Sequence, residues 1–193
     1  MYFQNPDSAI LKQKKLFIFD MDGTIYLGGK PFDFAIRYIK KLRENGMRVL
    51  FFTNNASHTT PFYKEKLSRL GFEPREDEIM TSGDVTLEFL KRYRSGKSVY
   101  LVATDELCEE YRTKGISLLR GDEARADIVI TSFDTSLTSE QLDNACRFVR
   151  GGAEYLSTHP DFNCPTEHGF IPDSGAIAAF VTASTGVVPT YFG

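Results

Sequence analysis

The sequence predicts an α/β fold in two units, each built on a parallel sheet with helices beside it. Continuous apolar runs such as residues 15–20 and 47–54 fit strands that are buried on both faces. A stretch with apolar residues at helical spacing follows each run, and this alternation implies right-handed parallel crossover connections. The alternation starts again at Asp84. We therefore expect a second α/β unit that is inserted through short connections.

In the first half, turn and cap signals set the bounds of the elements. The Gly28-Gly29 pair predicts a small hairpin, and Thr60 followed by Pro61 predicts the N-cap and first turn of a helix. Gly46 is positioned to end the preceding helix. The elements expected here are a strand at 15–20, a helix at 33–45, a strand at 47–54, a helix at 60–70 and a short strand at 78–82.

The second half repeats the pattern. Thr138 and Gln141 predict a capping box at the start of a helix that Gly151 and Gly152 end. The chain after the last strand of this unit contains three prolines within 13 residues, which predicts a loop. The expected elements are a helix at 84–93, strand 99–103, helix 105–115, strand 126–134, a helix from 138, strand 154–159, a loop, helix 174–186 and the start of a strand at 188–193.

Composition and charge exclude several classes of protein. The formal net charge is −3, with basic residues scattered among acidic ones, so the sequence has no electrostatic footprint for nucleic acid. No apolar run approaches the roughly 18 residues of a membrane helix, and the first ten residues carry no secretory core, which favours a soluble, cytoplasmic chain without membrane partners. The cysteines have no CxxC spacing, and we expect free thiols at Cys108, Cys146 and Cys164.

Two carboxylates, Asp20 and Asp22, directly follow the first apolar run. A calcium loop would need glycine and glutamate where Ile25 and Pro31 stand, so that interpretation fails. A solvated turn remains an alternative, because Asp-Gly pairs are common in turns. A carboxylate at a strand end can also attack phosphorus, and a second one two residues on can act as general acid and base.

Phosphoryl transfer also needs positioning and charge stabilisation. Mg²⁺ would screen the repulsion between Asp20 and Asp22 and neutralise the phosphoryl oxygens. The segment TNNAS, which begins at Thr53 at the end of the neighbouring strand, supplies a hydroxyl and backbone N–H groups for those oxygens. In parallel sheets, ligands bind beyond the carboxyl ends of the strands. The sequence therefore predicts a phosphoryl site at this edge.

At these motifs the sequence resembles the haloacid dehalogenase superfamily. The match is DMDGT from Asp20 and Thr53 at the end of VLFFT, and the Asn54-Asn55 pair, the flap and the insert resemble its nitrophenylphosphatase-like, or NagD-like, subfamily. The resemblance implies a Rossmann-like core with an inserted α/β cap. It divides the chain into a disordered or tag-like N-terminus at 1–13, a core at 14–84, a cap at 85–187 and the start of a return to the core at 188–193.

The resemblance also implies roles for individual residues. Asp20 would be nucleophile and Mg²⁺ ligand. Asp22 would be acid and base and would bind the metal through its backbone carbonyl, and Thr53 and Asn54 would bind the phosphoryl group. In the cap, His159 and Asp161 would face the substrate, although both also fit structural turn positions and His159 replaces the usual asparagine. Members hydrolyse small phosphate esters such as sugar phosphates, nucleoside monophosphates, phosphoglycolate or pyridoxal phosphate, and homodimers through the cap occur among them.

Two further motifs of the family are not found in these 193 residues. The third motif is a lysine beside a glycine after a strand like residues 190–193, and the fourth adds aspartates to the Mg²⁺ site. We therefore expect a core without its C-terminal strands, an exposed apolar edge at residues 16–20, weak metal binding and little or no turnover, as in a fragment of a longer phosphatase. A phosphate-ligand-binding or interaction module without catalysis remains the alternative. A phosphoacceptor signalling domain is disfavoured, because the acidic motif lies on the first strand.

Overall fold

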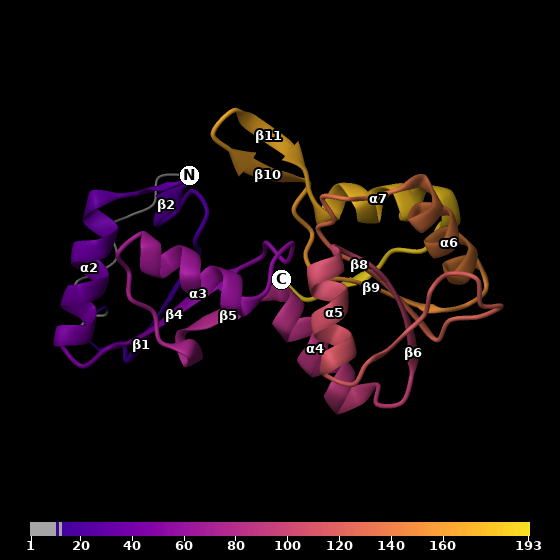
Figure 1. Ribbon diagram of the computed structural model, residues 1–193, viewed down its shortest axis with the longest axis horizontal. Helices are drawn as coiled ribbons and strands as arrows, with labels where there is room; N and C mark the ends of the chain where they lie inside the picture. Colours follow the sequence, from indigo (N-terminus) through magenta and orange to yellow (C-terminus); the bar gives the residue numbers. More distant parts are fainter. Residues whose placement is uncertain (1–10, 12) are drawn as a thin grey trace.

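The computed structural model describes residue 11 and residues 13–193 and shows two α/β lobes side by side (Figure 1). We refer to residues 13–81 as the first lobe and to residues 82–193 as the second lobe. Each lobe has its own parallel sheet, as the alternation of strands and helices predicts. Most of the segment 1–13, expected to be disordered or tag-like, lies outside the described residues.

The first lobe is a three-stranded parallel sheet in the order β1-β4-β5, with helices packed on it. Its elements are β1 (Leu16–Phe19), β2 (Tyr26–Leu27), β3 (Lys30–Pro31), α2 (Asp33–Glu44), β4 (Arg48–Thr53), α3 (Thr60–Arg69), the 3-10 turn η1 (Glu76–Glu78) and β5 (Ile79–Thr81). In the parallel register Phe19 pairs with Phe51, and Thr53 pairs with Thr81. The carboxyl ends of all three strands therefore meet at one edge of the sheet.

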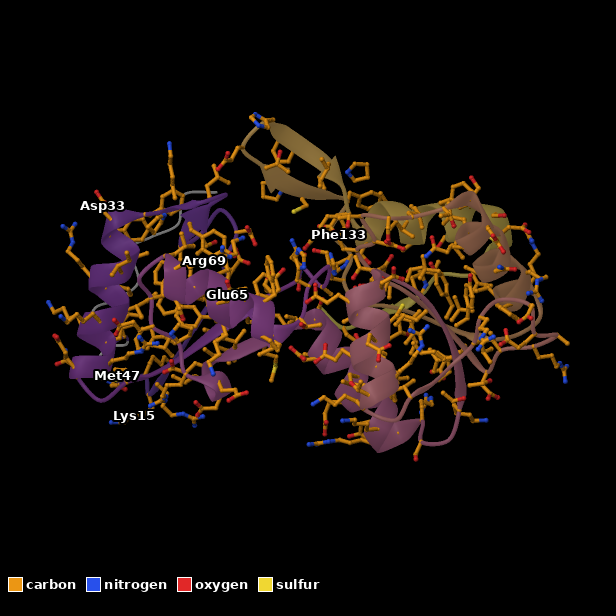
Figure 2. The ribbon with its side chains drawn as sticks, in the orientation of Figure 1. Lys15, Asp33, Met47, Glu65, Arg69 and Phe133 are labelled. Atoms are coloured by element: carbon orange, nitrogen blue, oxygen red, sulfur yellow. The ribbon has the colours of Figure 1, made fainter. Side chains whose placement is uncertain are left out.

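An apolar cluster fills the space between this sheet and its helices (Figure 2). Fully buried members are Met21, Ile25, Tyr26, Ile39, Phe51 and Leu67. β1 is the edge strand, and the side chain of Ile18 is 60% exposed, which confirms the predicted apolar edge.

The second lobe is a five-stranded parallel sheet in the order β12-β9-β8-β6-β7. Its elements are α4 (Ser82–Tyr93), β6 (Ser98–Val102), α5 (Asp105–Thr113), β7 (Ser117–Leu118), β8 (Ile128–Thr131), α6 (Ser139–Arg150), β9 (Glu154–Ser157), β10 (Asn163–Thr166), β11 (Gly169–Pro172), α7 (Ser174–Thr185) and β12 (Thr190–Tyr191). One apolar cluster contains residues of α4 and α5 and another contains residues of α6 and α7, so helices cover both faces. The capping box of Thr138 and Gln141 is present as predicted.

The proline-rich segment after β9 differs from the prediction. Instead of a plain loop it forms the β10-β11 hairpin, which projects from the second lobe toward the first (Figure 1). Pro165 and Pro172 are tolerated because both strands of a two-stranded hairpin are edge strands, in which alternate residues have no neighbouring strand to donate to. Gly169 supplies the backbone with φ of 123° at the turn.

Other bounds also differ from the expectation. α4 starts at Ser82, so the expected boundary between residues 84 and 85 falls inside a helix that Thr81 and Asp84 cap. β12, from the segment expected to return to the core, pairs with β9 in the second sheet. The N-cap of α3 is Thr59 rather than Thr60, and its hydroxyl donates to Glu106 of the second lobe instead of capping the helix.

Two further findings concern the whole described chain. Among the described residues, no helix combines the length and apolar character needed to cross a membrane. The three cysteines, Cys108, Cys146 and Cys164, are all buried and carry free thiols.

The loop after β4 joins the lobes. The Thr104 hydroxyl donates to the Ser57 carbonyl at 2.9 Å, and Glu106 accepts from the backbone N–H of Thr59 at 2.9 Å and from its hydroxyl at 2.7 Å. His58 Nδ1 lies 2.8 Å from the other Glu106 oxygen, and its ring stacks on Phe62. The loop that follows the predicted phosphoryl site is thus fixed to the start of α5.

We expect this link to weaken in acid. Partial burial acts to raise the pKa of Glu106, but the bonds from His58 and Thr59 outweigh it and hold the pKa below its ordinary value. The contribution of the carboxylate to stability is therefore complete above the ordinary pKa and is lost as the pH falls through the lowered one. Because Glu106 is half-exposed, the loss should stay below about 1 kcal/mol. Urea unfolding at pH 7 and pH 4 should show less acid sensitivity in Glu106→Gln than in wild type.

The matched control is Glu109→Gln on the same helix, where the carboxylate is exposed and pairs only with Arg112. If both variants lose stability equally on acidification, the link through Glu106 is not the acid-sensitive contact.

Candidate active site

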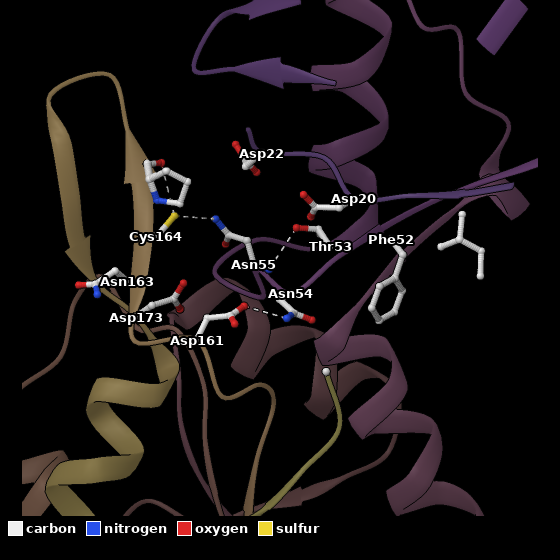
Figure 3. A pocket seen from close by; sticks show the side chains of 13 residues that line it. Asp20, Asp22, Phe52, Thr53, Asn54, Asn55, Asp161, Asn163, Cys164 and Asp173 are labelled. Carbon is white, nitrogen blue, oxygen red and sulfur yellow. Dashed lines mark hydrogen bonds between the residues drawn. The ribbon is translucent and has the colours of Figure 1, made fainter. Parts of the chain in front are cut away.

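A pocket of about 510 Å³ lies where the carboxyl ends of β1 and β4 face the β10-β11 hairpin (Figure 3). The first lobe contributes the residues that follow its strands, and the second lobe contributes the hairpin and the turn before it. The lining residues are Ile18, Asp20, Asp22, Phe52, Thr53, Asn54, Asn55, Asp161, Asn163, Cys164, Pro165, Asp173 and Gly193. Five of the six predicted site residues, all except His159, are among them.

Asp20 directly follows β1, and its side chain is exposed to the pocket. Its Oδ2 accepts a hydrogen bond of 2.6 Å from the hydroxyl of Thr24. The turn that brings Thr24 back is closed by Gly23, whose φ of 81° favours glycine, and by backbone bonds to the Met21 carbonyl. One carboxylate oxygen is therefore held by a neutral donor while the other is open to a reactant.

Asp22 is more enclosed, with 18% of its side chain exposed. The Tyr26 hydroxyl donates to its Oδ2 at 3.1 Å, and Lys66 Nζ lies 3.4 Å from its Oδ1 and 4.2 Å from the centre of the Tyr26 ring. Burial, and next the charge of Asp22, raise the pKa of Tyr26 far above its ordinary value. The Tyr26 phenol therefore keeps its proton and, as the hydrogen-bond donor, holds the Asp22 carboxylate in place.

Thr53 ends β4 and is 2% exposed, with its hydroxyl facing the pocket. Its Oγ1 accepts from the backbone N–H of Asn55 at 3.1 Å, and the side chain of Asn55 in turn accepts from the N–H of Ser57 at 3.1 Å. These successive turns are local, because each side chain bonds the backbone two residues on. They hold the loop in one conformation beside Asp20.

The second lobe supplies the opposite wall of the pocket. Asp161 accepts from the side-chain amide of Asn54 at 2.8 Å, so the predicted phosphoryl residue and the predicted cap residue meet. The Asn55 amide lies 3.7 Å from the Cys164 sulfur. Burial, and next the charge of Asp173, raise the pKa of the Cys164 thiol to about 11. Cys164 therefore lines the pocket as a neutral thiol.

His159 differs from the prediction. Its ring is fully buried and does not line the pocket, so in this arrangement it cannot touch a substrate. The reason is a buried partner: His159 Nε2 lies 2.8 Å from Asp173, the N-cap residue of α7. Asp173 itself, which we did not predict, reaches the pocket wall.

The charge of the pocket fits a hard cation. Four carboxylates line it, from Asp20, Asp22, Asp161 and Asp173, and no lysine or arginine is among the described lining residues. The described residues hold no group of three or more His, Cys, Asp or Glu side chains placed around one metal position. Mg²⁺ is bound in many enzymes by one or two carboxylates, substrate phosphate and water. Asp20 and Asp22 fit that ligand set.

Comparisons with known proteins agree with this site. The family described as haloacid dehalogenase-like hydrolases matches residues 17–117. An acid sugar phosphatase of Staphylococcus aureus is 35% identical over 183 residues, which cover 95% of this chain and 70% of that protein. The crystal structure of a 4-nitrophenylphosphatase from Thermotoga maritima has a TM-score of 0.87 and 37% identity, covering 95% of this chain and 70% of its own.

A third similar protein is the glycerol phosphate phosphatase of Mycobacterium tuberculosis, whose structure in complex with magnesium has a TM-score of 0.83 and 30% identity, covering 92% of this chain and 53% of its own. The family match includes the Asp20-Asp22 motif and Thr53, and the structural likeness extends over both lobes. The chain therefore belongs to the haloacid dehalogenase-like hydrolases, in the subfamily of nitrophenylphosphatase-like and NagD-like phosphatases.

Proposed function

We propose that this chain is a Mg²⁺-dependent phosphomonoester hydrolase that acts through an aspartyl-phosphate on Asp20. The observation that carries the proposal is the pocket itself, in which Asp20 and Asp22 at the end of β1 face the same space as Thr53 at the end of β4. An exposed carboxylate oxygen, a second carboxylate held by donors and a buried hydroxyl are the groups that phosphoryl transfer requires.

In the first step, the free oxygen of Asp20 attacks phosphorus. A bond from this oxygen to phosphorus forms and the bond to the ester oxygen breaks. Asp22 enters this step carrying the proton that it took from water in the preceding turnover, gives it to the ester oxygen so that the alcohol leaves, and becomes the carboxylate that Tyr26 and Lys66 hold. In the second step, water attacks the phosphorus of the aspartyl-phosphate, Asp22 takes a proton from the water, and Asp20 is released as a carboxylate with inorganic phosphate.

The surrounding residues support both steps. Tyr26 and Lys66 hold the Asp22 carboxylate in place, and Thr53 with the side chain of Asn54 binds the non-bridging oxygens. Mg²⁺, held by Asp20 and Asp22 when bound, would offset the negative charge of the phosphoryl group. Without it, a phosphate dianion entering a pocket of four carboxylates would meet strong repulsion.

We further propose that the leaving alcohol is small, hydroxylated and uncharged. The wall opposite Asp20 presents the carboxylates of Asp161 and Asp173 and the amide of Asn163. The described lining residues include no cation. Hydroxyl groups can donate to these carboxylates, whereas a second phosphate or a carboxylate on the substrate would be repelled. The names of similar proteins, acid sugar phosphatase and glycerol phosphate phosphatase, support the same class.

The proposal is tested by phosphate release from p-nitrophenyl phosphate, glycerol phosphate and phosphoglycolate, with and without Mg²⁺. We expect release that chelation by EDTA abolishes, with glycerol phosphate preferred over phosphoglycolate. Release by these 193 residues should be slow, because the lining residues described here bring no lysine or arginine to the phosphoryl site.

Release that is unaffected by EDTA would contradict the role of Mg²⁺, and a preference for phosphoglycolate would contradict the proposed alcohol. Phosphate binding without any release would favour the non-catalytic binding module. A homodimer remains a separate expectation that light scattering on the purified chain can decide.

A further inference from the structure

The buried His159 lies at the centre of a polar network in the second lobe that reaches Asn54 of the first lobe. Its Nε2 is 2.8 Å from Asp173 Oδ1, and its Nδ1 is 3.0 Å from the Thr158 hydroxyl and 3.3 Å from the Ser82 hydroxyl. All four residues are at most 4% exposed. A polar network so deeply buried is costly unless every member is paired, so its arrangement is closely defined.

The hydroxyl groups beside the ring also contact other residues. Ser82 donates its one hydroxyl hydrogen to the Asn54 carbonyl at 2.7 Å, so it has none left for Nδ1. The Thr158 hydroxyl lies 3.0 Å from Nδ1 and 3.2 Å from the Ser132 hydroxyl. The ring thus fills the space beside the Ser82 hydroxyl and leaves the Asn54 carbonyl as the acceptor for its hydrogen.

Asp173 fixes the ring from one side. It also accepts from the backbone N–H of Ser174 at 2.6 Å, at the N-terminus of α7, where a negative charge is favoured. Ser82 from α4 is uncharged, as is Thr158. Asp161, two residues beyond His159, is engaged with Asn54. Among these partners, the single charged group in contact with His159 is thus the Asp173 carboxylate.

The network ends on the loop that binds phosphate in the proposed function. Ser82 is the first residue of α4, a helix whose start is fixed by the capping box of Thr81 and Asp84. From there its hydroxyl holds the backbone carbonyl of Asn54, while Asp161 holds the side chain of the same residue. Two residues of the second lobe therefore hold Asn54, Ser82 at its carbonyl and Asp161 at its side chain.

We propose that His159 is a positioning residue: held by Asp173, its ring keeps the Ser82 hydroxyl on the Asn54 carbonyl and so sets the phosphate-binding loop from the second lobe. The inference rests on the proposed function for the role of the loop, but the geometry of the network stands without it. His159 acts through Ser82 and touches no reacting atom. If the ring is lost, Ser82 can rotate toward the vacated space and the Asn54 peptide is free to turn.

The positioning is tested with His159→Gln and Ser82→Ala, singly and together, and with His168→Gln as the matched control. We measure the backbone amide signals of Asn54 and Asn55 and the dissociation constant of inorganic phosphate with Mg²⁺. Each single variant should shift both signals and weaken phosphate binding about five- to tenfold, as expected for one buried hydrogen bond. The double variant should bind phosphate no more weakly than whichever single variant binds it less tightly, because the two residues act in series.

Two outcomes would overturn the proposal. One is a folded Ser82→Ala or His159→Gln chain whose Asn54 and Asn55 signals stay in place, and the other is additive losses in the double variant. Ser82→Ala removes a single oxygen, so it keeps the test decisive if His159→Gln fails to fold. If wild type binds no phosphate at all, the proposed function fails, whereas the amide signals still decide the role of His159.

Discussion

Asp20→Asn is expected to abolish formation of the phosphoenzyme and to lower phosphate release about 10³-fold or more. The amide has nearly the shape of the carboxylate and can still accept the 2.6 Å hydrogen bond from Thr24. It cannot attack phosphorus as an oxygen anion, and it removes one of the four carboxylates that line the pocket. The change therefore tests the role of Asp20 as nucleophile while leaving the fold intact.

A readout that does not depend on turnover makes this test decisive. Fluoroberyllate binds aspartates as a mimic of a phosphoryl group, so with Mg²⁺ the wild-type chain should give a bound ¹⁹F NMR signal that Asp20→Asn lacks. The control is Asp143→Asn, on the exposed side of α6 far from the pocket. A bound signal of undiminished intensity in Asp20→Asn would show that another residue is the nucleophile.

The first lobe and its two carboxylates could be predicted because their signals are local. A run of apolar residues that ends in DMDGT fixes the position of Asp20 on the chain, and parallel pairing then fixes where it meets Thr53. The register between β1 and β4 confirms this reasoning, since Phe19 lies beside Phe51 and the next residues of both strands open into one pocket. Apart from this strand pairing, the prediction needed no side-chain contact between distant segments.

His159 could not be placed in the same way. A histidine before Pro160 fits an exposed turn as well as a buried one, and the choice depends on Asp173, 14 residues further on. The sequence places Asp173 before Ser174 and a helix, which is an N-cap signal, but it does not show that the cap also reaches a ring. The contacts of Lys66 and Tyr26 with Asp22 were not predicted for a similar reason, because the two residues come from different elements.

The turn that carries His159 and Asp161 depends on a close approach that Gly175 permits. Gly175 lies in the first turn of α7, and its N–H donates to the Asp161 carbonyl at 2.8 Å. A Cβ built at this position would overlap the Pro160 carbonyl. Intrinsic propensity favours alanine over glycine within a helix by about 1 kcal/mol. Gly175→Ala should nevertheless destabilise the chain by about 2–3 kcal/mol, because neither backbone segment can yield.

The same change should displace the acidic wall of the pocket, because Asp161 follows the clashing residue directly and holds the side chain of Asn54. Urea unfolding measures the stability, and the Asn54 amide signal reports the displacement. Gly29→Ala is the matched control, since a Cβ there meets no atom within 4 Å and the backbone does not require glycine. Equal effects of the two substitutions would mean that α7 and the turn are free to separate. The contacts of Asp161 and, through Ser82, of His159 with Asn54 would then be too loose to position it.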